Sequence, residues 1–299
     1  MIAIHRVLCP VDFSDASRSA LDHAAALARW YEARLVALHV VPLVPSTLTF
    51  PPAISAATLE PIPHELFYDE LRRFVAPVAE LVPAETVVVS GEPTRTILEQ
   101  AQGTEADLLV LGTHGRSGFE RLVLGSVAEK VLRRASCPVL TVPPAAAHAP
   151  GAPRPPYRRI LCPVDFSTTS ERALRYAMSL AEEAKARITV LHVLEWFPEQ
   201  EIREHRHFDV PEYRRFLEED ARRRLSEAVP EEARTWCEPV ERVGTGKAYR
   251  EILRVAGEEG SDAIVMGVHG RGAANLFFGS TANHVVRQAT CPVLTVRGR

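Results

Sequence analysis

Four residues in the first half of the chain have types and spacing suited to binding phosphate. Gly112 and Gly115 follow an apolar segment, and nine residues, 116–124, separate Gly115 from Gly125-Ser126, where a helix is predicted to begin. Glycine lets the backbone approach a ligand closely, and a helix N-terminus offers unpaired N–H groups and about half a positive charge. These features favour an anion site. The alternative is that Ser126 only caps its helix and the glycines only turn the chain.

An acidic residue, Asp12, follows the apolar segment 7–11 directly. Ligands of open parallel sheets bind beyond the carboxyl ends of the strands. A carboxylate at such a strand end can accept hydrogen bonds from ribose hydroxyls. The other interpretation is that Asp12 is a plain helix N-cap.

Strands and helices are predicted to alternate along the chain, which places these residues at one edge of a sheet. Apolar runs without polar interruptions indicate a parallel sheet covered on both faces, so we expect a doubly wound α/β fold. In the first half the predicted strands are 7–11, 35–41, 86–89, 107–111 and 139–142, and the predicted helices are 14–31, 65–81, 94–102 and 126–134. In the second half the predicted strands are 159–164, 188–193, 239–243, 263–267 and 293–296, and the predicted helices are 169–184, 212–227, 248–258 and 280–289.

The chain repeats itself at a near-constant offset, which indicates a duplicated domain. The recurring segments are Leu8–Ser14 with Leu161–Ser167, Leu38–Val40 with Leu191–Val193, Gly112–Arg116 with Gly267–Arg271, Gly125-Ser126 with Gly279-Ser280, and Cys137–Val142 with Cys291–Val296. Between the copies, proline supplies six of the fourteen residues 143–156, so this stretch is an extended linker. We expect domains at 1–143 and 157–299.

The glycine spacing, together with the strand-end sequence Pro10-Val11-Asp12, resembles the ATP-binding universal stress proteins over nearly the whole chain. The resemblance implies two five-stranded parallel sheets in the order 3-2-1-4-5. It also implies that Asp12 contacts the ribose, that the backbone of Val11 and Val40 contacts adenine, and that the glycines and Ser126 hold the phosphates. Arg116 belongs to the same motif. The matching residues of the second copy are Pro163, Val164, Asp165, Val193, Gly267, Gly270, Gly279 and Ser280.

Several further expectations concern assembly and the site. The short apolar strands 139–142 and 293–296 should pair, giving a pseudo-dimer, and the resemblance implies a homodimer. The long proline-rich segment 42–63 is expected to border the nucleotide as a lid. The loop after Gly270 has eight residues before Gly279, one fewer than in the first copy. This difference predicts that the second glycine is displaced and that the first copy is the better ATP site.

Composition excludes some partners. The 35 basic and 38 acidic residues give a net charge of −3, which does not support binding to nucleic acid or to an anionic membrane. No apolar run reaches the ~20 residues that span a bilayer, and the chain does not open with a signal-peptide pattern, so a cytoplasmic protein is expected. Four of the five cysteines precede Pro-Val and are interpreted as small apolar residues.

Three motifs are interpreted as decoys. The run Gly244–Lys247 lacks the first glycine and the final Ser or Thr of a P-loop. His205 and His207 have no further ligand at metal-binding spacing. The arginines 222–224 lie among acidic residues and are interpreted as a solvated helix face.

The sequence therefore predicts a stress or signalling protein that binds ATP, with or without Mg²⁺, and whose conformation or association responds to the nucleotide. A slow ATPase is an alternative, although no general base, metal-ligand set or Walker lysine can be named. Another adenine nucleotide, such as cyclic AMP, is also open, because a glycine-rich helix terminus does not specify the length of the phosphate chain.

Overall fold

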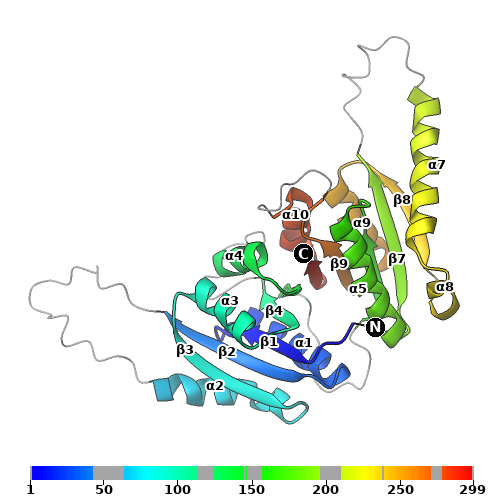
Figure 1. Cartoon of the computed structure of the whole chain (residues 1–299). Coiled ribbons are helices and arrows are strands. Elements are labelled where there is room, and N and C mark those ends of the chain that lie inside the picture. Colours follow the sequence, from blue (N-terminus) through cyan, green and yellow to red (C-terminus); the bar gives the residue numbers. More distant parts are fainter. Residues whose placement is uncertain are drawn as a thin grey trace, which may run out of the picture.

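The structure, a computed structural model, describes residues 2–42, 64–113, 124–144, 146, 157–195, 210–237, 239–270 and 278–297. Strands and helices alternate as predicted (Figure 1). The first copy consists of β1 (Arg6–Pro10), α1 (Asp15–Trp30), β2 (Arg34–Pro42), α2 (His64–Ala79), β3 (Ala84–Gly91), α3 (Pro93–Gly103), β4 (Leu108–Gly112), α4 (Ser126–Arg134) and β5 (Val139–Val142). The second copy consists of β6 (Arg159–Pro163), α5 (Thr168–Ala184), β7 (Arg187–Leu194), α7 (Val210–Ala228), α8 (Ala233–Trp236), β8 (Val240–Thr245), α9 (Ala248–Glu259), β9 (Ala263–Gly267), α10 (Ser280–Gln288) and β10 (Val293–Val296).

The strands form one sheet in the order β3-β2-β1-β4-β5-β10-β9-β6-β7-β8. Within each copy this is the predicted order 3-2-1-4-5, and the paired strands of a copy run parallel. Two copies of a doubly wound domain are thus joined edge to edge.

Successive residues of β1 point to opposite faces of the sheet, and both faces are buried. Val7 and Cys9 pack into the apolar layer beneath α1, α2, α5 and α7, whereas Leu8 packs into the layer beneath α3, α4, α9 and α10. The unbroken apolar runs of the sequence follow from this burial on two sides.

The two copies meet through β5 and β10, which pair antiparallel and confirm the expected pseudo-dimer. Leu140 lies opposite Leu294. On either side of this pair, the Thr141 hydroxyl donates to the Val293 carbonyl and the Thr295 hydroxyl donates to the Val139 carbonyl, each at 3.1 Å.

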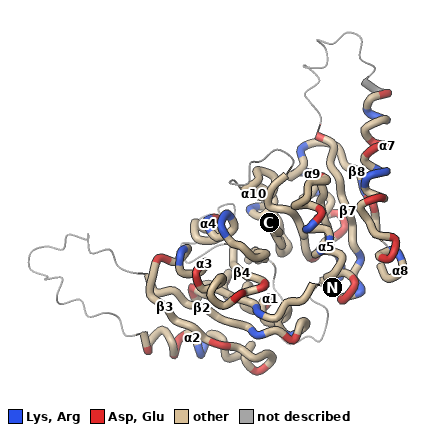
Figure 2. The backbone as a smooth tube through the Cα atoms, in the orientation of Figure 1, with Lys and Arg blue, Asp and Glu red and all other residues tan. Residues whose placement is uncertain are grey.

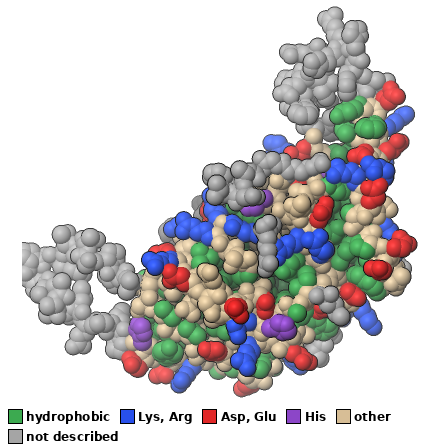
Figure 3. All heavy atoms as spheres, viewed as in Figure 1, with side chains coloured by type: hydrophobic (Ala, Val, Ile, Leu, Met, Phe, Trp, Pro, Cys, Tyr) green, Lys and Arg blue, Asp and Glu red, His purple; other side chains and the backbone are tan. Residues whose placement is uncertain are grey.

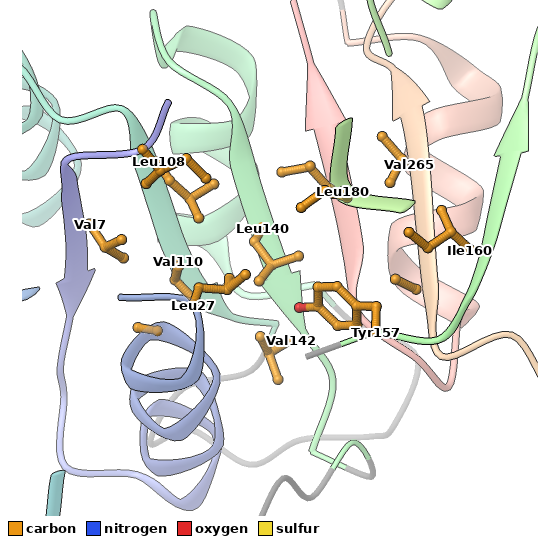
Figure 4. Packing of buried hydrophobic residues seen from close by; sticks show 14 of the residues in the cluster. Val7, Leu27, Leu108, Val110, Leu140, Val142, Tyr157, Ile160, Leu180 and Val265 are labelled. Carbon is orange, nitrogen blue, oxygen red and sulfur yellow. The ribbon is translucent and has the colours of Figure 1, made fainter. Parts of the chain in front are cut away.

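Apolar side chains from both copies fill the space beside this junction. Figure 4 shows Tyr157 and Leu180 of the second copy beside Leu140, with Leu27 on the other side of it. An ion pair between Arg287 and Glu129, 3.2 Å long, also crosses between the copies. The junction is therefore a continuous core and not a flexible tether.

The basic run 222–224 lies on α7, where acidic and basic residues alternate along the helix (Figure 2). Arg222 pairs with Glu218 at 3.3 Å and Arg223 pairs with Glu227 at 2.7 Å. Arg224 instead turns inward, with its guanidinium carbon 4.0 Å from the centre of the Phe166 ring. Acidic and basic side chains both occur across the face seen in Figure 3. The prediction of a solvated helix face therefore holds for Arg222 and Arg223 but not for Arg224.

The cysteines are placed as apolar residues, as the sequence predicted. Cys9 and Cys162 are fully buried in β1 and β6, and burial raises the pKa of both thiols. Burial also raises the pKa of Cys137 and Cys237 to about 11 and that of Cys291 to about 12. At neutral pH all of these thiols are protonated, and the thiolate is the nucleophilic form.

We therefore predict that the folded chain reacts slowly with Ellman's reagent at pH 8, and that all five thiols react promptly once the chain is unfolded in guanidinium. Reduced glutathione, measured beside the protein, gives the rate for an unhindered thiol. Rapid reaction of one or more thiols in the folded chain would contradict this account.

Among the described residues, no helix has the length and apolar character needed to cross a membrane.

Candidate functional site

A cavity of about 530 Å³ opens in the second copy beyond the carboxyl ends of β6, β7 and β9. Its volume is in the range of small-molecule sites. All eight residues that the sequence predicted for the second copy line it: Pro163, Val164, Asp165, Val193, Gly267, Gly270, Gly279 and Ser280. Residues more than a hundred positions apart in the sequence thus surround a single space.

Asp165 lies in a tight turn between β6 and α5. Its Oδ1 accepts hydrogen bonds from the backbone N–H and the hydroxyl of Ser167, at 3.1 and 2.6 Å. Ser167 in turn caps α5 by accepting from Ser170 N at 3.2 Å. In the first copy Asp12 makes the same two bonds to Ser14, at 3.1 and 2.5 Å. The interpretation of Asp12 as the N-cap is therefore wrong, because Ser14 caps α1.

The residue after each aspartate has a strained backbone. Phe13 and Phe166 have φ angles of 64° and 60°, in the left-handed region. For a residue with a bulky side chain this conformation costs roughly 1–2 kcal/mol, and such strain gathers at functional sites. The turn directs the chain sharply from the strand into the helix and leaves the aspartate at the strand end.

The backbone of Val193 faces the space beyond the end of β6. The Leu191 carbonyl accepts from Val164 N at 2.8 Å on the β6 side, while the Leu194 carbonyl accepts from Gly246 N at 3.0 Å on the β8 side. Because successive residues of a strand direct their N–H and C=O groups to opposite sides, Val193 directs both groups toward β6, which has already ended. Val40 stands in the same place past β1, where the Leu38 carbonyl accepts from Val11 N at 2.8 Å.

The glycine loops close in the same way in both copies. Gly125 N donates to the Thr113 carbonyl at 2.8 Å, and Gly279 N donates to the Val268 carbonyl at 2.9 Å. Both glycines are N-caps with nearly equal backbone angles, φ −56° and ψ 138° against φ −58° and ψ 142°. The expectation that the shorter loop displaces Gly279 is therefore wrong, because Gly279 bonds its strand end and caps its helix as Gly125 does.

A glycine N-cap has no side chain with which to bond the first N–H groups of its helix. Ser126 and Ser280 are the first helical residues of α4 and α10 and are not the caps. The N–H groups of this first turn have no intrahelical partner. In the second copy they lie at the cavity wall, since Ser280, Thr281 and Ala282 all line it.

Close contacts explain why positions 112 and 270 are occupied by glycine. A Cβ atom on Gly112 would stand 2.8 Å from the Ala16 carbonyl oxygen, so this glycine lets α1 pack against the end of β4. A Cβ atom on Gly270 would stand 2.6 Å from Asp165 Oδ2. The loop that begins at Gly270 therefore starts directly beside the strand-end carboxylate.

The first-copy residues occupy the same places in their domain. Pro10 ends β1, with Val11 and Asp12 directly after it, Val40 lies in β2, Gly112 ends β4, and Gly125-Ser126 begins α4. Gly115 and Arg116 lie outside the described residues, as do residues 43–63 of the expected lid and both His205 and His207.

The structure adds cavity residues that the sequence analysis missed. Thr281 places a second hydroxyl residue after Ser280, where the first copy has Val127. Glu195, at the end of β7, lines the cavity and accepts a hydrogen bond from Ala248 N at 2.9 Å. The remaining ones are Ser170, Leu191, His192, Ala248, Ile252, Met266, Val268, His269 and Ala282. Comparing the two copies position by position would have identified Thr281, but nothing in the sequence marks Glu195.

The structure places the decoy run 244–247 at the junction of β8 and α9. Gly244 and Thr245 end β8, and Lys247 is the N-cap of α9, so this run forms no phosphate loop. Within the described part of the chain, no group of three or more His, Cys, Asp or Glu residues is placed to hold a metal ion.

Comparison with known proteins agrees with this geometry. A model of the universal stress protein family matches residues 3–143 and again residues 156–297. Universal stress protein Rv2005c of Mycobacterium tuberculosis is 28% identical over 276 residues, which cover 85% of this chain and 88% of that protein. Universal stress protein MJ0531 of Methanocaldococcus jannaschii is 36% identical over 142 residues, which cover 46% of this chain and 81% of that protein.

A crystal structure of a universal stress protein from Archaeoglobus fulgidus shares the fold, with a TM-score of 0.64 over 98% of both chains at 21% identity. Two matches of the family model, in tandem, account for the duplicated sheet and for the repeated glycine loops alike. The chain therefore belongs to the universal stress protein family, as a member with two domains in tandem.

Proposed function

We propose that the chain binds an adenine nucleotide, ATP foremost, in each of two domains, 1–143 and 157–299, and that occupancy alters its conformation or association. One observation carries the proposal. The cavity of about 530 Å³ in the second copy is lined by every residue that the sequence predicted for nucleotide binding there. ATP with Mg²⁺ on its phosphates is the ligand form proposed.

The residues that line the cavity offer several kinds of chemistry, and this supports a nucleotide. The first turn of α10 lines it with N–H groups, the positive end of a helix dipole and the hydroxyl-bearing residues Ser280 and Thr281. The apolar residues Ile252 and Met266 and the backbone edge of Val193 also line it. Asp165 lies at the end of β6, and its carboxylate can accept from ribose. The phosphates, the sugar and the base of a nucleotide can therefore each contact residues of suitable chemistry.

The nucleotide is tested by releasing ligands from gently purified protein and identifying them by mass spectrometry. Calorimetric titration with ATP, AMP and cyclic AMP then ranks their affinities. The proposal expects an adenine nucleotide in the released fraction and ATP as the tightest ligand. Cyclic AMP binding most tightly would change the ligand but keep the site. Binding of none of the three would refute the proposal.

The role of the aspartates gives a sharper prediction. The double variant Asp12→Asn/Asp165→Asn should weaken ATP binding about 10- to 100-fold, since a hydrogen bond to a charged group contributes roughly 1.5–3 kcal/mol. Asparagine keeps an oxygen for Ser14 and Ser167, so the turn remains. If the carboxylates contact ribose, 2′,3′-dideoxy-ATP should bind the unsubstituted chain and the variant almost equally. If the loss of affinity from the aspartate substitutions and the loss from removing the ribose hydroxyls add together, the aspartates act elsewhere.

A further inference from the structure

A histidine lies against the strand-end turn in each copy. His39 of β2 is buried, and its Nδ1 is 2.8 Å from the Val11 carbonyl oxygen. His192 of β7 repeats this contact with the Val164 carbonyl, also at 2.8 Å. A carbonyl can only accept, so Nδ1 carries the hydrogen in both contacts.

Each histidine ring also packs against the strained phenylalanine of its turn. The ring centres of Phe13 and His39 are 4.5 Å apart, with 36° between the planes. The rings of Phe166 and His192 are 4.4 Å apart, with 37° between the planes. The histidine thus contacts the residue before the aspartate through a hydrogen bond and the residue after it through ring packing.

The surroundings of this arrangement differ between the copies, while the arrangement itself does not. In the first copy, Phe13 and His39 are joined by Phe74 and Phe67, whose rings lie 5.6 Å from Phe13 and 5.2 Å from His39 respectively. In the second copy the Arg224 guanidinium covers Phe166. A residue that served only to fill space would be expected to vary with its neighbours. Two different environments holding one geometry indicate that the turn is what the histidine serves.

The backbone on either side of the aspartate is fixed as a result. Val164 donates its N–H to the Leu191 carbonyl at 2.8 Å, and its own carbonyl accepts from His192 Nδ1. Both groups are therefore bound to β7, the strand that also carries Val193. His192 itself lines the cavity beside Val164, Asp165 and Val193. One ring thus sets the position of the aspartate relative to the strand edge opposite it.

We propose that His39 and His192 are positioning residues of the two nucleotide sites, each clamping its Val-Asp-Phe turn so that the aspartate and the neighbouring strand edge face one ligand. This inference rests on the proposed function, because its effect is read as nucleotide affinity. It assigns the histidines no contact with the nucleotide.

Two substitutions at His192 separate positioning from packing. They are made in the full chain with Gly115→Ala/Gly125→Ala present, so that the second site is read by itself. Asparagine can place an N–H donor where Nδ1 stands, whereas leucine keeps an apolar contact with the Phe166 ring but cannot donate. We expect His192→Leu to weaken ATP binding about tenfold, and His192→Asn to stay within about threefold of the parent.

Stability should follow the opposite order, with the leucine variant unfolding in urea at a concentration equal to or higher than the asparagine variant does. If ATP affinity follows the same order as stability, or if His192→Leu binds ATP as tightly as the parent does, this inference is overturned. The proposed function would then still stand. If the unsubstituted chain binds no adenine nucleotide, the proposed function fails and this inference fails with it. The leucine and asparagine substitutions at His39, with Gly270→Ala/Gly279→Ala present, repeat the test in the first copy. They decide the matter if a variant of the second copy does not fold.

Discussion

The variant Gly115→Ala/Gly125→Ala is expected to lose the tighter of two ATP-binding events, whereas Gly270→Ala/Gly279→Ala loses only the weaker one. The loop of the first copy has nine residues between its glycines and that of the second has eight. Both loops close through the same hydrogen bond to the strand end. The first copy therefore has one more residue with which to bring N–H groups to the phosphates.

The expected difference between the sites is tenfold to a hundredfold, because one charge-assisted hydrogen bond contributes roughly 1.5–3 kcal/mol. Thr281 acts in the other direction, since it adds a hydroxyl residue to the second cavity where the first copy has Val127. The matched variant Thr281→Val removes this difference and should widen the gap between the two affinities.

Calorimetric ATP titration of both glycine variants decides the ranking. The second-copy alanines act on their immediate neighbours, because a Cβ atom on Gly279 would stand 2.8 Å from the Val268 carbonyl oxygen and one on Gly270 would crowd Asp165. If the second-copy pair abolishes tight binding and the first-copy pair leaves it intact, the ranking of the sites is reversed. Circular dichroism of each variant confirms that the fold is retained.

Leu140→Ala should cost about 2–5 kcal/mol of folding free energy, the usual range for a buried leucine. Leu140 is 1% exposed and lies opposite Leu294, where the two copies join. The leucine also packs beside Tyr157 and Leu180 of the other copy (Figure 4), so its loss opens a cavity in a core that both domains share. Urea unfolding, followed by far-ultraviolet circular dichroism, measures the change.

Leu66→Ala is the matched control, since Leu66 of α2 is 62% exposed. Surface substitutions of this kind usually change stability by less than about 0.5 kcal/mol. Equal midpoints for the two variants would show that β5 and β10 do not join the copies through a shared core.

The bounds of strands and helices were predicted best where residues such as proline flank an apolar run. Pro138 and Pro143 flank β5, and the predicted bounds 139–142 are those observed. The bounds of α4 and β9 were also predicted correctly. In contrast, β3 was predicted as 86–89 but spans Ala84–Gly91, because it pairs with β2 along its full length. The partner strand, and not the local pattern, decides where such an edge strand ends.

What the sequence missed depends on contacts between distant segments. α8 has four residues, too few for a helical period to show. His39 and Val11 are 28 residues apart, so their hydrogen bond follows only from the pairing of β1 with β2. The glycine spacing identified the loop but not its closure, since the bond from Gly279 N to Val268 needs the strand and the helix in place.

The central claim is that one chain binds two molecules of ATP, each beyond the carboxyl ends of the strands of its own domain. Equilibrium dialysis of the full chain against labelled ATP and Mg²⁺ measures the number bound directly. The account predicts two ATP per chain at saturation, reduced to one by either glycine pair and to none by both pairs together. A saturation value that neither pair changes, or no bound ATP at millimolar concentration, would contradict it.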